Sequence, residues 1–378
     1  MKNIYTLSGL AVLVVGMIII STFKVKDPEI VVGAVLPVTG NFAYRGQSAM
    51  EGLLLAEDEI NKAGGINGKR LHVIIEDNKG EPTSAVTAVN KLLDVDGAKA
   101  IITSFTNLSS AVAPIVKERE VVMVYASTVD SLTKQGENIF KDYYSTYDIG
   151  QNFALSAKQE GLKSVGVLAP NIEWGDNFID GFVNKAEEIN LSYYVQTVSM
   201  QANDFKSEIL KFRQNKVDGL AIFSLQNNQI LKLVHGQGMQ VRLFMAELLN
   251  DSIVEDSNAM ATIEENSAIS SWYYFDSRNS DENSKTFVAN YNKKFGTNPR
   301  ADAAYSYDDL FVLRDVLAIC DKADTLNRQC LIDNLKLVEN YKGVSGEVSF
   351  GSDRISNRPL KYYIYKENEW QEYTIISN

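Results

Sequence analysis

Residues 29–77 read EIVVGAVLPVTGNFAYRGQSAMEGLLLAEDEINKAGGINGKRLHVIIED, and this stretch decides the fold. It opens with a short apolar, β-branched run that ends at Pro37, which is typical of a buried strand and its turn. From about Gly46 the apolar residues recur at helical spacing until a Gly-Gly pair ends the pattern. A second β-branched run follows at 70–76. The stretch therefore predicts a strand, a helix and a strand, the repeating unit of a parallel sheet.

The same alternation continues along the chain and then begins again after a break, which predicts an α/β fold with two Rossmann-like lobes. The first set goes on with helix 82–93, strand 98–103, helix 109–118 and strand 121–126. The second set comprises strands 163–169, 193–198, 219–224 and 241–245 and helices 174–189, 205–214 and 229–235. A strand (270–275), three helices (284–295, 303–319, 329–337) and a β-rich tail with a hairpin turned at Glu367-Asn368 complete the chain.

Composition argues against several classes of function. The chain has 378 residues and a formal net charge of −11, so nucleic acid is not an expected partner. Its two histidines and two cysteines leave little material for a metal site or for His-dependent catalysis. A strand followed by G-x-G-x-x-G is missing from the sequence, which argues against a dinucleotide enzyme. We therefore expect no enzymatic activity, no cofactor and no metal.

The N-terminal segment 1–27 predicts export. An almost unbroken apolar run covers 7–20, after Lys2. The residues that follow, Ser21-Thr22-Phe23, make a poor cleavage site, and 4–23 approaches the ~20 residues that span a bilayer. A removable signal peptide and an uncleaved transmembrane anchor both remain open. Either one predicts an extracytoplasmic protein, in the periplasm or on the outer face of the membrane.

Export also bears on the two cysteines. Cys320 and Cys330 flank a polar, loop-like spacer, and an oxidising compartment would allow them to form a disulfide, which we expect. Two separate buried thiols are the alternative, because cysteine also packs as a small hydrophobic residue.

Three stretches together resemble one known family: 33–86, with its LPVTG and EINKAGGINGK segments, 99–133, and YKGVSGEVSF at 341–350. They are similar to the Leu/Ile/Val-binding group of type I periplasmic binding proteins, solute receptors that feed ABC importers. The resemblance extends from about Ile30 to the C-terminus.

The resemblance implies a fold with three chain crossings between the lobes. Residues 28–148 and 276–345 would then form lobe 1, and 149–275 and 346–378 lobe 2. It further implies a monomer that traps an amino-acid-like molecule in a cleft by hinge closure and delivers it to ABC permease subunits. A membrane-anchored sensor with the same fold, signalling to a partner protein, is the alternative.

Ligands of open α/β sheets bind beyond the carboxyl ends of the strands, so the loops there supply the first candidate residues. One such loop contains Ser104, Thr106 and Asn107, and the resemblance assigns it to the ligand's α-carboxylate. Whether Thr106 or Asn107 makes this contact stays open, and either could be a helix N-cap instead. The next loop contains Ala126, Ser127 and Thr128. There the resemblance implies a main-chain carbonyl for the ammonium and the Thr128 hydroxyl for the carboxylate.

The second lobe offers Glu247, Trp174 and Gln226. By resemblance Glu247 faces the ligand ammonium, although a solvated loop carboxylate is the alternative. Trp174 would cover the ligand, and Gln226 stands where relatives often carry an aromatic residue.

Arg45 is a second departure, since many relatives carry a bulky aromatic near its position. An inward Arg45 would favour a polar or acidic ligand. If it points outward, Tyr44 takes the aromatic's role. We therefore expect a zwitterionic ligand more polar than leucine.

Overall fold

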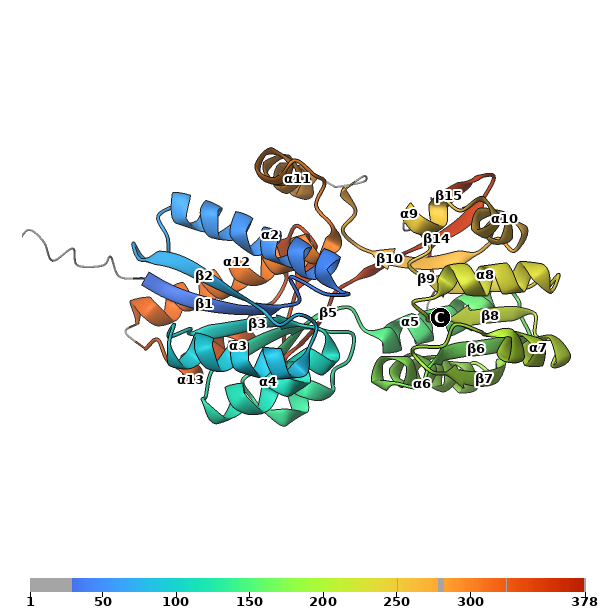
Figure 1. Cartoon of the computed structure of the whole chain (residues 1–378), viewed down its shortest axis with the longest axis horizontal. Coiled ribbons are helices and arrows are strands. Elements are labelled where there is room, and N and C mark those ends of the chain that lie inside the picture. Colours follow the sequence, from blue (N-terminus) through green and yellow to red (C-terminus); the bar gives the residue numbers. More distant parts are fainter. Residues whose placement is uncertain (1–28, 250, 278–281, 324, 377–378) are drawn as a thin grey trace, which may run out of the picture.

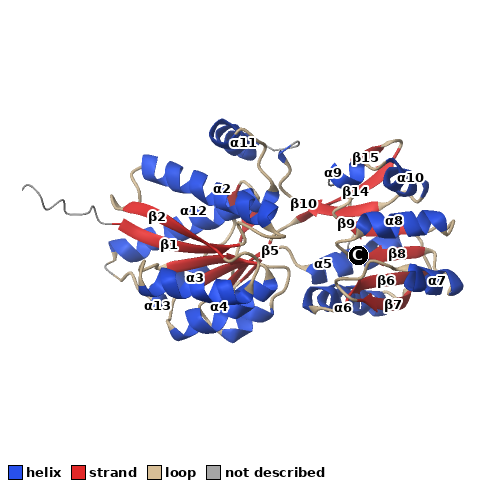
Figure 2. Cartoon of the chain, viewed as in Figure 1, coloured by secondary structure: helices blue, strands red, loops and turns tan. Residues whose placement is uncertain are grey.

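The computed structural model describes residues 29–249, 251–277, 282–323 and 325–376. The expected export segment lies outside them. Within the described ranges, none of the helices combines the length and apolar character needed to cross a bilayer. Figure 1 shows two lobes side by side along the long axis, and Figure 2 shows helices flanking the strands of each.

The first lobe is built on a six-stranded sheet of order β13-β5-β4-β3-β1-β2, in which every neighbouring pair is parallel. Its strands are β1 (Glu29–Leu36), β2 (Arg70–Asp77), β3 (Ala100–Ser104), β4 (Val122–Ala126), β5 (Ile139–Tyr143) and β13 (Ile355–Asn357). One face packs on α2 (Ala43–Lys62), α12 (Ala301–Lys322) and α13 (Arg328–Lys336). The other face packs on α3 (Pro82–Asp94) and α4 (Thr106–Glu118). β1 is buried on both faces, as its continuous apolar run requires.

The second lobe is built on a seven-stranded sheet of order β15-β14-β10-β9-β8-β6-β7. Its strands are β6 (Ser164–Pro170), β7 (Ser192–Val198), β8 (Gly219–Ile222), β9 (Arg242–Ala246), β10 (Ile269–Tyr273), β14 (Leu360–Lys366) and β15 (Glu369–Glu372). α5 (Thr146–Gln159) and α6 (Glu173–Glu188) cover one face. α7 (Lys206–Gln214), α8 (Asn227–Gly236) and α10 (Ser257–Glu265) cover the other, and α9 (Asp251–Val254) precedes α10. Only the β10–β14 and β14–β15 pairs of this described sheet are antiparallel.

The chain passes between the lobes three times: from β5 to α5, from β10 to α11 (Glu282–Phe295), and from β13 to β14. α11 belongs to the first lobe, since Asn290 donates to Glu59 of α2 at 2.7 Å. The expected α/β architecture of two Rossmann-like lobes with a three-crossing hinge is therefore confirmed.

One expected boundary is placed differently by the structure. The family resemblance places everything after 345 in the second lobe, but β13 pairs in parallel with β5 of the first sheet. Before it, β11 (Tyr341–Gly343) and β12 (Gly346–Val348) form a separate antiparallel pair. The last crossing therefore occurs after Asn357, because the chain first adds an edge strand to the first sheet.

Two local predictions are confirmed. β14 and β15 form the expected hairpin, and Glu367 and Asn368 at its turn both have positive φ, 54° and 64°. Cys320 and Cys330 are joined by the expected disulfide. It ties the end of α12 to the first turn of α13.

Candidate functional site

In each lobe a parallel strand near the middle of the sheet is followed directly by a non-glycine residue with a left-handed backbone. Phe105 follows β3 with φ of 66°, and Glu247 follows β9 with φ of 59°. Such a conformation is uncommon for residues with a side chain and is concentrated at functional sites. Hydrogen bonds fix both: the Phe105 N–H donates to the Ala126 carbonyl at 2.9 Å, and the Glu247 N–H donates to the Ser271 carbonyl at 3.0 Å. These two positions mark the strand ends where the site was expected.

The first-lobe candidates gather around Phe105. Ser104 and Ala126 are register partners in the β3–β4 pair. The hydroxyls of Thr106 and Ser127 lie 2.7 Å apart, which joins the two candidate loops through side chains. Asn107 is exposed at the start of α4. Of the two residues that sequence left open, Thr106 is thus the one tied to the neighbouring loop.

Thr128 contacts the second lobe through its carbonyl. This oxygen accepts from the N–H of Thr146 at 3.2 Å and from the Asn177 amide at 3.4 Å. Thr146 begins α5 and Asn177 lies in α6. The Thr128 loop is therefore held at the place where the chain first crosses between lobes.

Arg45 points inward and is bound by its own lobe. Its Nε and Nη2 lie 3.1 and 3.0 Å from Oδ1 of Asp302, and its guanidinium carbon lies 5.4 Å from the centroid of the Phe105 ring. Arg45 lies in α2 and Asp302 in α12. The two helices approach closely because Gly52 of α2 faces the main chain of Ala303, where a Cβ would clash. Burial alone would lower the pKa of Arg45, but Asp302 raises it well above its ordinary value. The positive charge of Arg45 is therefore already compensated by Asp302 of its own lobe.

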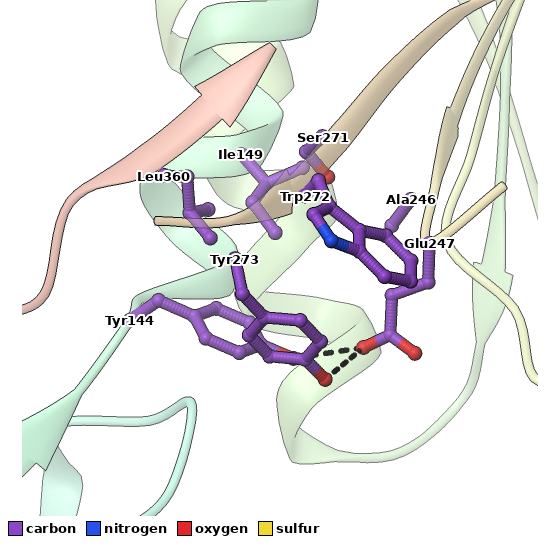
Figure 3. A pocket seen from close by; sticks show the side chains of 8 residues that line it. All are labelled: Tyr144, Ile149, Ala246, Glu247, Ser271, Trp272, Tyr273 and Leu360. Carbon is purple, nitrogen blue, oxygen red and sulfur yellow. Dashed lines mark hydrogen bonds between the residues drawn. The ribbon is translucent and has the colours of Figure 1, made fainter. Parts of the chain in front are cut away.

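Glu247 faces a small pocket at the start of the hinge (Figure 3). The pocket is lined by Tyr144, Ile149, Ala246, Glu247, Ser271, Trp272, Tyr273 and Leu360. The hydroxyls of Tyr273 and Tyr144 point at the Glu247 carboxylate and donate to its Oε1 at 2.6 and 3.3 Å. Burial, reinforced by this carboxylate, raises the pKa of Tyr144, so its hydroxyl stays a donor. Glu247 is thus a positioned carboxylate.

A chain of polar contacts joins the two lobes' candidates. Arg45 Nη2 donates to the Tyr143 hydroxyl and lies 3.4 Å from the Tyr273 hydroxyl, which in turn donates to Glu247. Burial raises the pKa of Tyr273 and Arg45 opposes this, while Glu247 adds to it. The structure thereby connects Arg45 and Glu247, the two charged candidates, through one tyrosine.

Trp174 and Gln226 lie away from this connection. The Trp174 ring packs edge-on against Phe223, with centroids 5.1 Å apart. The Gln226 side chain donates to the Met200 carbonyl at 3.2 Å and accepts from the Ser224 hydroxyl at 3.0 Å. Tyr44 is exposed, and the Arg300 guanidinium lies over its ring.

Sequence reasoning missed Asp302, Tyr143, Tyr144, Trp272 and Tyr273. Trp272 and Tyr273 lie in a run that was recognised as a strand, and their aromatic character was a usable signal. Asp302 gave only a weak sequence signal, because it is an acidic residue in the first turn of a helix.

Comparisons with known proteins identify the family of this chain. The family model described as periplasmic binding protein matches residues 29–366. A Leu/Ile/Val-binding protein homolog of Brucella melitensis is 25% identical over 62% of this chain and 66% of its own length. An amino acid binding protein of Pseudomonas aeruginosa is 31% identical over 68% of this chain and 69% of its own. This chain thus aligns with about two thirds of each relative.

Solved structures show the same fold. A leucine-binding protein of Thermotoga maritima superposes with a TM-score of 0.77 at 21% identity, covering 92% of this chain and 98% of that one. A substrate-binding protein of Streptococcus pneumoniae in complex with isoleucine gives a TM-score of 0.72 at 20% identity, covering 91% and 99%. The family model spans nearly all of the described chain, and the protein therefore belongs to the periplasmic binding protein family, with the fold of its type I members.

Proposed function

We propose that this protein is an extracytoplasmic solute-binding protein of an ABC importer, which captures an amino acid or a close analogue by hinge closure and releases it unchanged. The observation that carries the proposal is Glu247. Of the eight residues lining the pocket in the described chain, it alone carries a formal charge. A carboxylate in a partly closed site favours a cationic group, because a charge removed from water costs less when an opposite charge joins it.

The first lobe would hold the anionic end of the ligand. The paired Thr106 and Ser127 hydroxyls lie at the N-terminus of α4, a 13-residue helix whose first N–H groups favour anions. Thr128, with its carbonyl engaged by the second lobe, would offer its hydroxyl. A cation site on one lobe and an anion site on the other suit a zwitterion.

Arg45 sets the expected polarity of the ligand. Because Asp302 compensates its charge, it offers hydrogen-bond donors more than a free positive charge. We therefore favour a neutral polar ligand over an acidic one. Trp174 and Gln226 would reach it only after the lobes close.

The proposed delivery to a transporter is supported by the relatives. Leu/Ile/Val-binding and amino-acid-binding proteins are among them, so the partners proposed here are ABC permease subunits, with the protein acting as a monomer. Residues 4–23 would export or anchor it.

A thermal-shift panel of amino acids, amides and polycarboxylates tests the proposal. A ligand at a hundred times its Kd should raise the free energy of unfolding by about 2.7 kcal/mol. Glu247→Gln keeps an acceptor for both tyrosines but removes the charge, and it should abolish the stabilisation by amino acids. Glu255→Gln, an exposed carboxylate of the same lobe, is the control. Full stabilisation of Glu247→Gln would contradict the ammonium assignment.

A further inference from the structure

The pocket at Glu247 is mainly aromatic. Tyr144, Trp272 and Tyr273 supply three rings beside the single carboxylate, and Ile149 and Leu360 close the far side, as Figure 3 shows. Empty space in the pocket amounts to about 180 Å³, part of it open to solvent. The enclosed part of this space holds about one water molecule, so the head group of a ligand would lie on the open side of the pocket, against the rings.

The rings gather because β10 ends there. Neighbouring side chains on a strand normally point to opposite faces, yet the ring centroids of Trp272 and Tyr273 are 5.6 Å apart. Tyr273 is the last residue of β10 before the chain crosses between lobes. The Tyr144 ring, from the first crossing, lies 5.7 Å from that of Tyr273. Two crossings of the hinge thus bring aromatic rings to one carboxylate.

The Glu247 carboxylate already receives donors from the protein. Its Oε1 accepts the hydroxyls of both Tyr144 and Tyr273. A primary ammonium brings N–H donors that must compete with these hydroxyls for the carboxylate. An alkylated ammonium brings its charge without that competition, and its methyl groups contact ring faces, which attract cations.

From this arrangement we infer that the pocket binds an N-methylated ammonium group, so that the ligand is an amino acid of the betaine type. The inference rests on the proposed function and specifies its ligand class. The charge of Glu247 and the three rings recognise the methylated nitrogen. The carboxylate of the same ligand extends toward the Thr106 and Ser127 hydroxyls.

The test is a ligand series that changes only the nitrogen. Isothermal titration of the full exported chain would compare glycine, sarcosine, N,N-dimethylglycine and glycine betaine, and then leucine and glutamine with their N-trimethyl derivatives. Affinity should rise along the series, and the trimethyl compound of the preferred side chain should bind about tenfold tighter than its parent.

Variants separate the rings from the hydroxyls. Trp272→Leu should weaken binding of the trimethyl compound about tenfold. Tyr273→Phe keeps the ring and should keep the preference for methylation. Trp370→Leu is the control, since that ring packs on Tyr365 outside the pocket.

The possible failures are distinguishable. If primary amino acids bind and each methyl group weakens binding, the inference is wrong while the proposed function stands. If none of the amino acids and none of their trimethyl derivatives bind, both are wrong. A methylation preference that survives Trp272→Leu unchanged would also overturn the assignment to the rings.

Discussion

Arg45 and Arg358 are both surrounded by carboxylates and tyrosines, but they differ in their access to water. The Arg358 guanidinium lies 5.5 Å from the Tyr305 ring centroid, and the Arg45 guanidinium lies 5.9 Å from that of Tyr143. These two rings are 5.1 Å apart, so the arginine clusters are neighbours. The Arg358 side chain is 0% exposed, whereas 18% of the Arg45 side chain is exposed.

Arg358 holds the hinge together. It binds Asp142 in a bidentate pair, at 2.5 and 2.8 Å, and lies 3.5 Å from Asp308. Asp308 in turn accepts the N–H groups of Val344 and Ser345. The cluster joins the first and third crossings to α12, with nearly every group bonded. The arginine that holds the fold is thus fully buried, whereas the arginine proposed for the site remains in contact with water.

Arg358→Met should produce the largest effect. Removing the cation leaves buried carboxylates without a partner, and breaking such a pair costs about 3–5 kcal/mol. Urea unfolding without ligand measures the loss. Arg328→Met is the matched control, because its pair with Glu120 at 3.1 Å is exposed and should cost under about 1 kcal/mol. Equal losses in the two variants would mean that the buried Arg358 pair stabilises the fold no more than an exposed ion pair does.

Arg45→Met should cost less stability, about 1–2 kcal/mol, because water can reach Asp302 after the change. Its larger consequence should be on binding, since Arg45 contacts the Tyr273 hydroxyl that donates to Glu247. Titration with the best ligand should show a several-fold loss of affinity. If Arg45→Met lowered the free energy of unfolding as much as Arg358→Met does and left binding unchanged, Arg45 would stabilise the fold and would not contribute to binding.

The hinge also shows where pattern reading succeeds and where it stops. Apolar periodicity predicted most strands and helices of both lobes, because their cores are apolar. It missed β5 and α5, and β5 carries Lys141 and Asp142 in fully buried positions. Lys141 is compensated by Asp130 at 2.8 Å, and Asp142 by Arg358. Buried charges interrupt the apolar pattern, so the element that begins the hinge does not look like a strand.

For the candidate site, too, the sequence indicated some residues and gave no signal for others. Glu247 was a candidate because it directly follows a strand, where ligands of such sheets bind, and because the family resemblance places an acid there. Its tyrosine donors and the Arg45–Asp302 pair were not found, and the latter joins residues 257 positions apart. Such pairings depend on how α2 packs against α12, and a single sequence gives no signal for them.

At low pH, where Asp309 is protonated, Asp309→Asn should have the smallest effect of the three variants, and the change of this effect with pH tests how the Arg358 cluster balances its charge. Burial, and then the Asp142 carboxylate, raise the pKa of Asp309 well above 3.8, so the folded chain keeps a proton that the unfolded chain releases. That stabilisation is complete below about pH 3.8 and is lost as the pH rises toward the folded-state pKa. Relative to Asp309→Asn, the parent should lose up to about 1.4 kcal/mol per pH unit across this window.

Urea unfolding between pH 3 and pH 8 measures this slope, and Asp321→Asn provides a control of opposite sign at the acidic end of this range. The hydrogen bond from Lys69 lowers the pKa of Asp321, so its stabilisation is present at neutral pH and is lost as the pH falls. As the pH rises toward about 3.8, the parent should gain stability relative to Asp321→Asn, and as it rises further the parent should lose stability relative to Asp309→Asn. If both differences run in the same direction, Asp309 is ionised in the folded protein. Arg358 would then share one positive charge among three buried carboxylates, and full bonding would not by itself explain why that cluster tolerates burial.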